Sequence, residues 1–115
     1  MKVSPWVNGF PMGIEDDERL SNRAKKLNMI IHAEQNALLL AGSRAKEASL
    51  YVWGKPICAR CAVLIIQAGI SKIVATNPED EPNEEWCELG KLAVEMFEEA
   101  QIDIIFYKAE PFLRT

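Results

Sequence analysis

The feature that most constrains this sequence is a pair of short motifs that together carry one imidazole, one carboxylate and two thiols. The first motif holds His32 and Glu34, and the second holds Cys58 and Cys61. One histidine and two cysteines are a ligand set used in catalytic zinc sites, which keep a fourth position open for water. The chain must therefore fold so that two segments far apart in sequence meet around one metal ion.

The spacing within each motif predicts how the side chains face the metal. Cys58 and Cys61 are three positions apart, which puts both sulfur atoms on one side of a helical first turn. His32 and Glu34 are two positions apart, a spacing that suits a helix entrance, where one residue still has non-helical dihedral angles. His32 can then bind the metal while Glu34 faces the bound water. If both segments open helices, two positive helix ends favour thiolates and a bound hydroxide.

Each motif on its own also has an ordinary structural explanation. His32 lies near an apolar run and could be a packed core residue, while the cysteine pair could be a redox pair or part of a structural zinc site. A structural zinc normally has four protein ligands, but the sequence has no second histidine and only Cys87 as a further thiol. The order of a His-x-Glu helix, a strand and a Cys-x-x-Cys helix favours a zinc deaminase.

The same residues carry a family resemblance. The His32-Ala33-Glu34 motif, Pro56 and the 58–61 motif resemble the signature of the cytidine/deoxycytidylate deaminase superfamily. The narrower resemblance is to the deoxycytidylate (dCMP) deaminases and rests on residues 8–13, 32–37, 51–53 and 61–70, within a similarity that runs from about residue 8 to 74. One departure is that the superfamily usually has Pro directly before the first Cys, whereas Ile57 intervenes here.

The resemblance implies a fold, a cofactor and a reaction. The fold would be the cytidine deaminase-like three-layer α/β/α sandwich, and the cofactor would be one Zn²⁺ on His32, Cys58 and Cys61. The reaction would be hydrolysis of a cytosine nucleotide, dCMP to dUMP plus ammonia, with Glu34 as the proton shuttle. A homo-oligomer is also implied. The substrate contacts implied are the backbone at Ala33 and near Ile57 for the base, Asn8 for the sugar, and Trp53 beside the ring.

The resemblance also predicts missing elements. The family begins with a helix and a first strand ahead of the Asn8-Gly9 segment, and this sequence starts too late to contain them. In the family that strand lies between the Asn-Gly strand and the strand before the cysteines, so its absence would leave a gap with unpaired backbone groups. We therefore expect either that native N-terminal residues are missing or that another chain fills the gap.

Length and charge narrow the function further. The chain has 115 residues, of which 49% are apolar and 26% charged, which suits a single domain over residues 1–115. Its formal net charge of −4 provides no broad basic surface for DNA or RNA and favours a small substrate. The unpaired Cys87 suits a reducing cytoplasm. The sequence shows no signal peptide at its start and no apolar run of membrane-spanning length.

Hydrophobic periodicity predicts strands alternating with helices, and hence an α/β fold with at least part of the sheet parallel. The expected strands cover 3–7, 50–53, 70–75 and 102–107, the first at a sheet edge. The expected helices cover 32–41, 58–68 and 84–100, with a polar loop and a short helix over 14–28 and a tail after 109. The expected buried faces of the helices are 33, 37, 40 and 41; 61, 64, 65 and 68; and 86, 89, 93, 96, 97 and 100.

A basic cluster precedes the first motif and consists of Arg19, Arg23, Lys25 and Lys26. Such charges are commonly a solvated helix face. The functional alternative is that one or two of them bind a substrate or effector phosphate through charge-assisted hydrogen bonds.

Two rival functions remain open. One is a deaminase that acts on another amino-heterocycle, such as cytidine, cytosine, guanine or a tRNA base, although the acidic net charge disfavours tRNA. The other is a catalytically silent interaction module stabilised by zinc, which predicts that replacing Glu34 changes nothing measurable.

Overall fold

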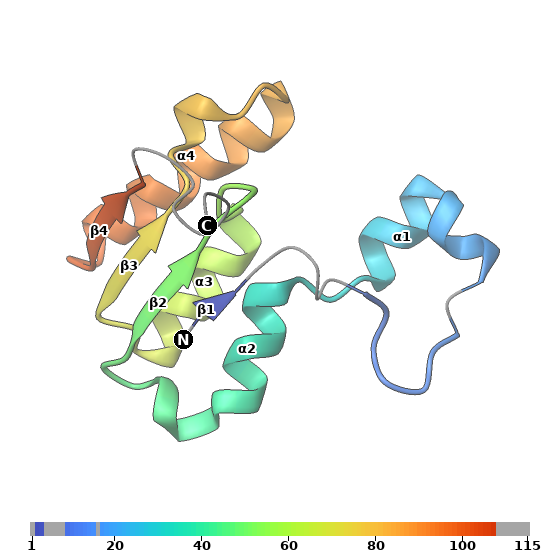
Figure 1. Cartoon of the computed structure of the whole chain (residues 1–115), viewed down its shortest axis with the longest axis horizontal. Helices are drawn as coiled ribbons and strands as arrows, with labels where there is room; N and C mark the ends of the chain where they lie inside the picture. The colour runs from blue at the N-terminus through green and yellow to red at the C-terminus, as the bar shows by residue number, and fades with distance from the viewer. Residues whose placement is uncertain (1, 4–8, 16, 108–115) are drawn as a thin grey trace, which may run out of the picture.

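Helices and strands alternate along the chain in the computed structural model, which describes residues 2–3, 9–15 and 17–107 (Figure 1). The strands are β1 (Lys2–Val3), β2 (Ser49–Val52), β3 (Lys72–Ala75) and β4 (Asp103–Phe106). The helices are α1 (Arg23–Met29), α2 (Ala33–Ala41), α3 (Ala59–Ala68) and α4 (Glu84–Glu99), with 3₁₀ turns η2 (Glu18–Ser21), η3 (Gly42–Ala45) and η4 (Pro78–Asp80). The strands lie in the order β1-β2-β3-β4, and every neighbouring pair is parallel. The predicted α/β class is confirmed, and the arrangement is consistent with a cytidine deaminase-like fold.

The first strand lies at the edge of the sheet, directly beside β2. Lys2 is paired with Tyr51 and Val3 with Val52. The predicted gap beside β2 is therefore wrong for the part of the sheet that the structure describes, because β1 itself occupies that position. The remainder of the predicted first strand, residues 4–7, and the following Asn8 lie outside the described residues.

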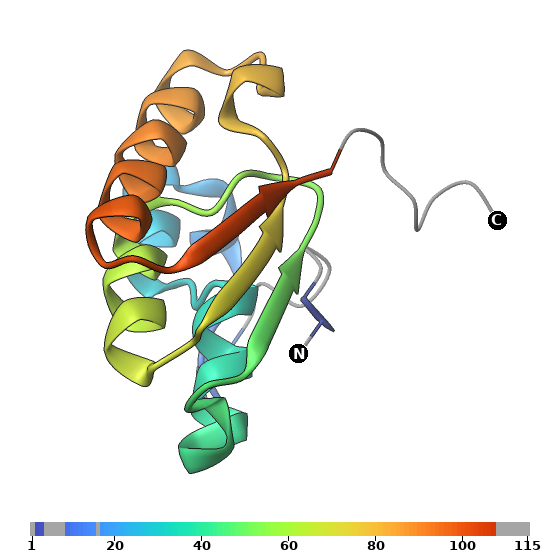
Figure 2. The ribbon, with the colours of Figure 1, turned by 90° about the vertical axis from the view of Figure 1, so that its left-hand side faces the viewer.

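The core lies on one face of the sheet. Alternate residues of β2 and β3 are buried, as expected for strands with one face against helices. Figure 2 shows α3 and α4 side by side on that face, and α2 packs against α3. On the opposite face Tyr51 and Val74 are half-buried and Ile105 is 47% exposed. Among the described residues, α2, α3 and α4 thus form one helical layer. The buried core consists of Ala33, Ala45, Leu50, Val52, Ile57, Cys58, Cys61, Ala62, Ile65, Ile70, Ile73, Ala75, Ala93 and Phe97.

Helix lengths agree with the sequence pattern more closely than the predicted buried faces do. Ala93 and Phe97 are buried as predicted, whereas Leu40 is 73% exposed, Leu64 is 46% exposed, and Ala100 is exposed at the C-cap of α4. Periodicity alone cannot separate a core-facing stripe from apolar side chains on the outer side of the same helix layer. The three predictions of burial are wrong for that reason.

Residues 10–15 and 17–30 form an excursion from the α/β body that carries η2 and α1 (Figure 1). The two ends of this excursion are joined because Gly9 and Ile31 exchange backbone hydrogen bonds of 3.3 and 2.7 Å. No residue of α1 is buried. The structure thus confirms a short helix in this polar segment. No helix among the described residues is long and apolar enough to cross a membrane.

Candidate metal centre and adjoining pocket

The two motifs stand at the entrances of two helices. His32 is the N-cap of α2 and Cys58 the N-cap of α3, and both have extended backbone dihedral angles. The side chain of Gln35 accepts a hydrogen bond from the His32 backbone N–H at 2.9 Å, which fixes the start of α2. Cys61 lies in the first turn of α3. The prediction that both motifs open helices is therefore confirmed.

These entrances bring the three donors together. The Nδ1 atom of His32 lies 3.2 Å from the Sγ atom of Cys61 and 3.6 Å from that of Cys58. All three potential ligand atoms lie within 4.8 Å of one another. A tetrahedral zinc with ordinary bond lengths to nitrogen and sulfur would place those two ligand atoms about 3.6 Å apart. The spacing fits the metal, so the triad is positioned to hold a metal ion.

Hydrogen bonds among the three side chains of the triad shift their pKa values in a way that suits metal binding. The hydrogen bond from Cys61, followed by that from His32, lowers the pKa of Cys58 to about 4 despite burial. The same contact with Cys58, together with burial, raises the pKa of Cys61. The hydrogen bond with Cys58 also raises the pKa of His32. A metal bound here would displace these shared protons, as metal binding to thiol and imidazole ligands generally does.

Glu34 lies two residues after His32, in the first turn of α2. Its side chain is half-buried and lines a small cavity together with His32. Burial raises the pKa of its carboxyl group, while hydrogen bonding with Cys61 and the charge of His32 oppose that rise. Glu34 does not belong to the group of residues whose ligand atoms lie close enough to share a metal ion. That group consists of the histidine and the two cysteines. A carboxylate at a metal site that is not a ligand is free to exchange protons with a substrate.

A cavity of about 40 Å³ opens on His32 and Cys58 of the triad. Trp53 lies in its wall, and the buried residues Ala33 and Ile57 directly adjoin His32 and Cys58 in sequence, while the predicted contacts of all three with the substrate stay predictions. Ile57 is 4% exposed, so the residue that interrupts the usual Pro-Cys pair belongs to the core. Asn8 lies outside the described residues, so its proposed sugar contact stays a prediction. The wall is formed by His32, Glu34, Val52, Trp53, Lys55, Pro56, Cys58 and Trp86.

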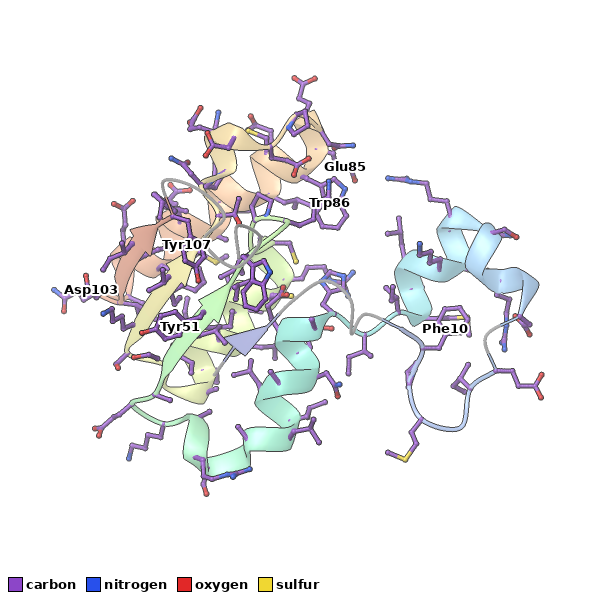
Figure 3. The ribbon with its side chains drawn as sticks, viewed as in Figure 1. Phe10, Tyr51, Glu85, Trp86, Asp103 and Tyr107 are labelled. Carbon is purple, nitrogen blue, oxygen red and sulfur yellow. The ribbon has the colours of Figure 1, made fainter. Side chains whose placement is uncertain are left out.

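Trp86 is the wall residue that the sequence analysis assigned to the core stripe instead. Its ring centroid lies 6.4 Å from that of His32, at an interplanar angle of 40°. Figure 3 shows Trp86 next to Glu85 at the start of α4, on the side turned toward α1. A signal was available, since helices that follow parallel strands begin at the carboxyl edge of the sheet, where ligand sites of α/β proteins lie.

The four predicted basic residues are not equivalent in the structure. Arg23 and Lys26 line a second cavity, of about 380 Å³, that also reaches His32 and Trp86. Arg19 is hydrogen-bonded to Asp17 at 2.8 Å, and its guanidinium lies 5.9 Å from the centre of the Phe10 ring. Lys25 lines neither of the two cavities.

The fold and the triad define an α/β protein with one histidine and two cysteines positioned to hold a metal ion. A family model described as the cytidine and deoxycytidylate deaminase zinc-binding region matches residues 14–77, which include both motifs. The chain therefore belongs to the cytidine and deoxycytidylate deaminase family.

Individual relatives agree with that membership. An Aliivibrio fischeri protein named as an uncharacterized deaminase in the luxG 3′ region is 32% identical over 102 residues, which cover 89% of this chain and 69% of that protein. The deoxycytidylate deaminase of Pongo abelii is 38% identical over 79 residues, covering 63% of this chain and 44% of its own length. That of Mus musculus is 36% identical over 90 residues, covering 72% and 50%. The chain thus spans half or less of the length of these two deoxycytidylate deaminases.

Proposed function

We propose that residues 1–115 act as a single zinc-dependent deaminase domain that hydrolyses dCMP to dUMP and ammonia. The observation that carries this proposal is the position of Glu34 at the same small cavity as His32 and Cys58, two members of the triad that Cys61 completes. The choice of dCMP is supported by the relatives named deoxycytidylate deaminase. The substrate is a small molecule, consistent with the acidic net charge of −4.

The chemistry divides between the metal ligands and the carboxylate. His32, Cys58 and Cys61 would hold Zn²⁺, and zinc bound there supplies the Lewis acidity that lowers the pKa of water. Glu34 accepts a proton from water and donates it to the ring nitrogen. It then takes the second proton of that water from the hydroxyl group added at the amine-bearing carbon, and passes it to the amine as ammonia leaves. Overall, water adds at the amine-bearing carbon and ammonia departs. The cytosine ring becomes uracil without any redox change.

The remaining wall residues orient the base. We assign Trp53 to packing beside the ring, and the backbone at Ala33 and Ile57 to contacts with its polar edge. Both of these backbone positions lie beside metal ligands in sequence, and both side chains are buried, which fixes the chain there. The sugar contact of Asn8 is part of the same proposal.

The test is ammonia release from dCMP, CMP, deoxycytidine and cytosine by the zinc-loaded protein. We expect kcat/KM for dCMP to exceed that for deoxycytidine by about tenfold or more, as charge-assisted contacts to phosphate allow. Glu34→Gln should slow release by at least about 10²-fold. Glu95→Gln, which changes an exposed carboxylate on α4, should leave it unchanged. Efficient turnover of cytosine or deoxycytidine in preference to both nucleotides would replace dCMP as the substrate.

The same pair of variants separates an enzyme from a catalytically silent zinc-stabilised module. In a silent module Glu34→Gln and Glu95→Gln behave alike in every assay, because neither residue binds the metal. Ammonia release by the wild-type protein that is lost only with Glu34→Gln excludes that alternative.

We also propose that the chain forms a homo-oligomer in the cytoplasm. Apolar side chains are exposed on the outer side of the helix layer, which is costly for a monomer in water. Leu39 and Leu40 are 72% and 73% exposed on α2, and Val63 is 52% exposed on α3. A second copy covering these side chains would remove them from water. The cysteines that the structure describes are free thiols, which suits a reducing compartment.

A further inference from the structure

A second cavity adjoins the metal pocket and shares two wall residues with it, His32 and Trp86. Its volume is about 380 Å³, against about 40 Å³ for the metal pocket. The smaller volume has room for about three water molecules. A nucleotide whose base reaches the metal must therefore extend out of that pocket, and the larger cavity lies next to it.

The wall of the larger cavity is positively charged on its α1 side. Arg23 and Lys26 lie three residues apart on α1, a spacing that places both on the same side of the helix. None of the acidic residues that the structure describes forms an ion pair with Lys26. Arg23 donates to Glu85 at 3.0 Å, with both side chains largely exposed. That pair neutralises the carboxylate of Glu85, which would otherwise repel an anion, and leaves the charge of Lys26 available.

Three other cations near the site do not line the larger cavity. Lys55 lines the metal pocket, but its ammonium group contacts Glu81 at 3.0 Å, and the Glu81 side chain is only 5% exposed. Arg19 is paired with Asp17 at 2.8 Å. Lys25 neighbours Lys26 on α1 but does not line the cavity.

We propose that the larger cavity is a phosphate subsite in which Lys26, supported by Arg23, binds the phosphate monoester of the nucleotide substrate while Trp86 separates it from the ring. This assignment rests on the proposed function and deepens it, because it names the residues that distinguish a nucleotide from a nucleoside. Lys26 contributes a compact charge with three donors. Arg23 has further N–H groups that can donate to the phosphate while its Nη2 donates to Glu85.

The chain provides a matched control for this test, since Lys25 and Lys26 are adjacent on the same exposed helix. Lys26→Ala should lower kcat/KM for dCMP by about tenfold or more, the usual scale of one charge-assisted contact. It should leave kcat/KM for deoxycytidine within about twofold, because a nucleoside has no phosphate to lose. Lys25→Ala should change neither value. An equal loss for both substrates with Lys26→Ala, or equal effects of the two alanine variants, would overturn the assignment.

A binding measurement separates failure of the subsite from failure of the proposed reaction. Calorimetric titration with dUMP and with deoxyuridine requires no turnover. We expect the wild-type protein and Lys25→Ala to prefer dUMP, and Lys26→Ala to lose most of that preference. If the preference survives in Lys26→Ala, the subsite lies elsewhere, whatever the protein deaminates. If the protein binds dUMP through Lys26 but releases no ammonia from dCMP, the subsite stands and the proposed reaction fails.

Discussion

Replacing Gly90 by alanine is the perturbation that best tests how the fold supports the metal centre. Gly90 is buried in α4, at the point where that helix meets two prolines. A Cβ atom at this position would lie 3.0 Å from Cβ of Pro56 and 3.0 Å from Cβ and Cγ of Pro78. Pro56 stands two residues before Cys58, so pressure on its ring is transmitted to the segment that carries the first thiol.

The size of the effect follows from two opposing contributions. Overpacking a well-filled core by one methyl group costs about 1–3 kcal/mol. An alanine in a helix interior is better than glycine by about 1 kcal/mol. Both neighbours here are proline rings, which cannot swing away as a flexible side chain would. We therefore expect a net loss of about 1–2 kcal/mol, which for a domain of this size lowers Tm by roughly 4–10 °C.

Thermal unfolding followed by circular dichroism measures the loss, with Glu95→Ala on the exposed side of α4 as the control. The same samples, titrated against a zinc chelator, report whether the metal is held less tightly in Gly90→Ala. An unchanged or raised Tm would mean that α4 shifts freely away from the prolines, and would refute the idea that this contact braces the Cys58 segment.

Three further outcomes are expected. Cys58→Ala should lose bound zinc by elemental analysis while Cys87→Ala, the substitution of a thiol outside the triad, retains it; equal zinc in both would remove Cys58 from the ligand set. Glu34→Gln should keep the zinc and the fold but lower kcat by at least about 10²-fold, the scale of general acid–base catalysis, and near wild-type turnover would assign the proton transfer to another group. Light scattering at micromolar concentration should give a mass above that of the monomer, and Val63→Glu should lower it if the outer helix surface is the interface.

Local chemistry in the sequence was sufficient to predict the metal centre. How a helix begins determines where residues at these spacings point, both for Cys58 and Cys61 and for His32 and Glu34. The structure brings His32, Cys58 and Cys61 together as expected. The helix ends were also readable, since Gly69 adopts the left-handed conformation (φ 87°) that closes α3. Such signals are contained in a few neighbouring residues and need no knowledge of the tertiary packing.

Features that depend on tertiary packing were harder to predict. Leu40 and Leu64 satisfy the helical periodicity but lie on the outer side of the helix layer, because the core side was already occupied by smaller residues such as Ala62. The position of β1 depends on a pairing with β2 that no local pattern encodes. Trp86 fits the apolar periodicity of α4 and was therefore assigned to the core. Only the tertiary structure, which places the start of α4 beside His32, shows that Trp86 belongs to the site.

The position of the site explains why one short chain can present both a metal triad and an anion subsite. His32 precedes α2, Cys58 precedes α3, and Trp86 lies in the first turn of α4, so three helix entrances meet there. Each entrance contributes partial positive charge, which favours a thiolate and an anionic substrate. The negative charges in the first turn of α4 work against this effect. The ion pair between Arg23 and Glu85 offsets part of that negative charge. The excursion that carries α1 is therefore more than a connection between β1 and α2, because it places a cation beside a pocket that the α/β body alone would leave open.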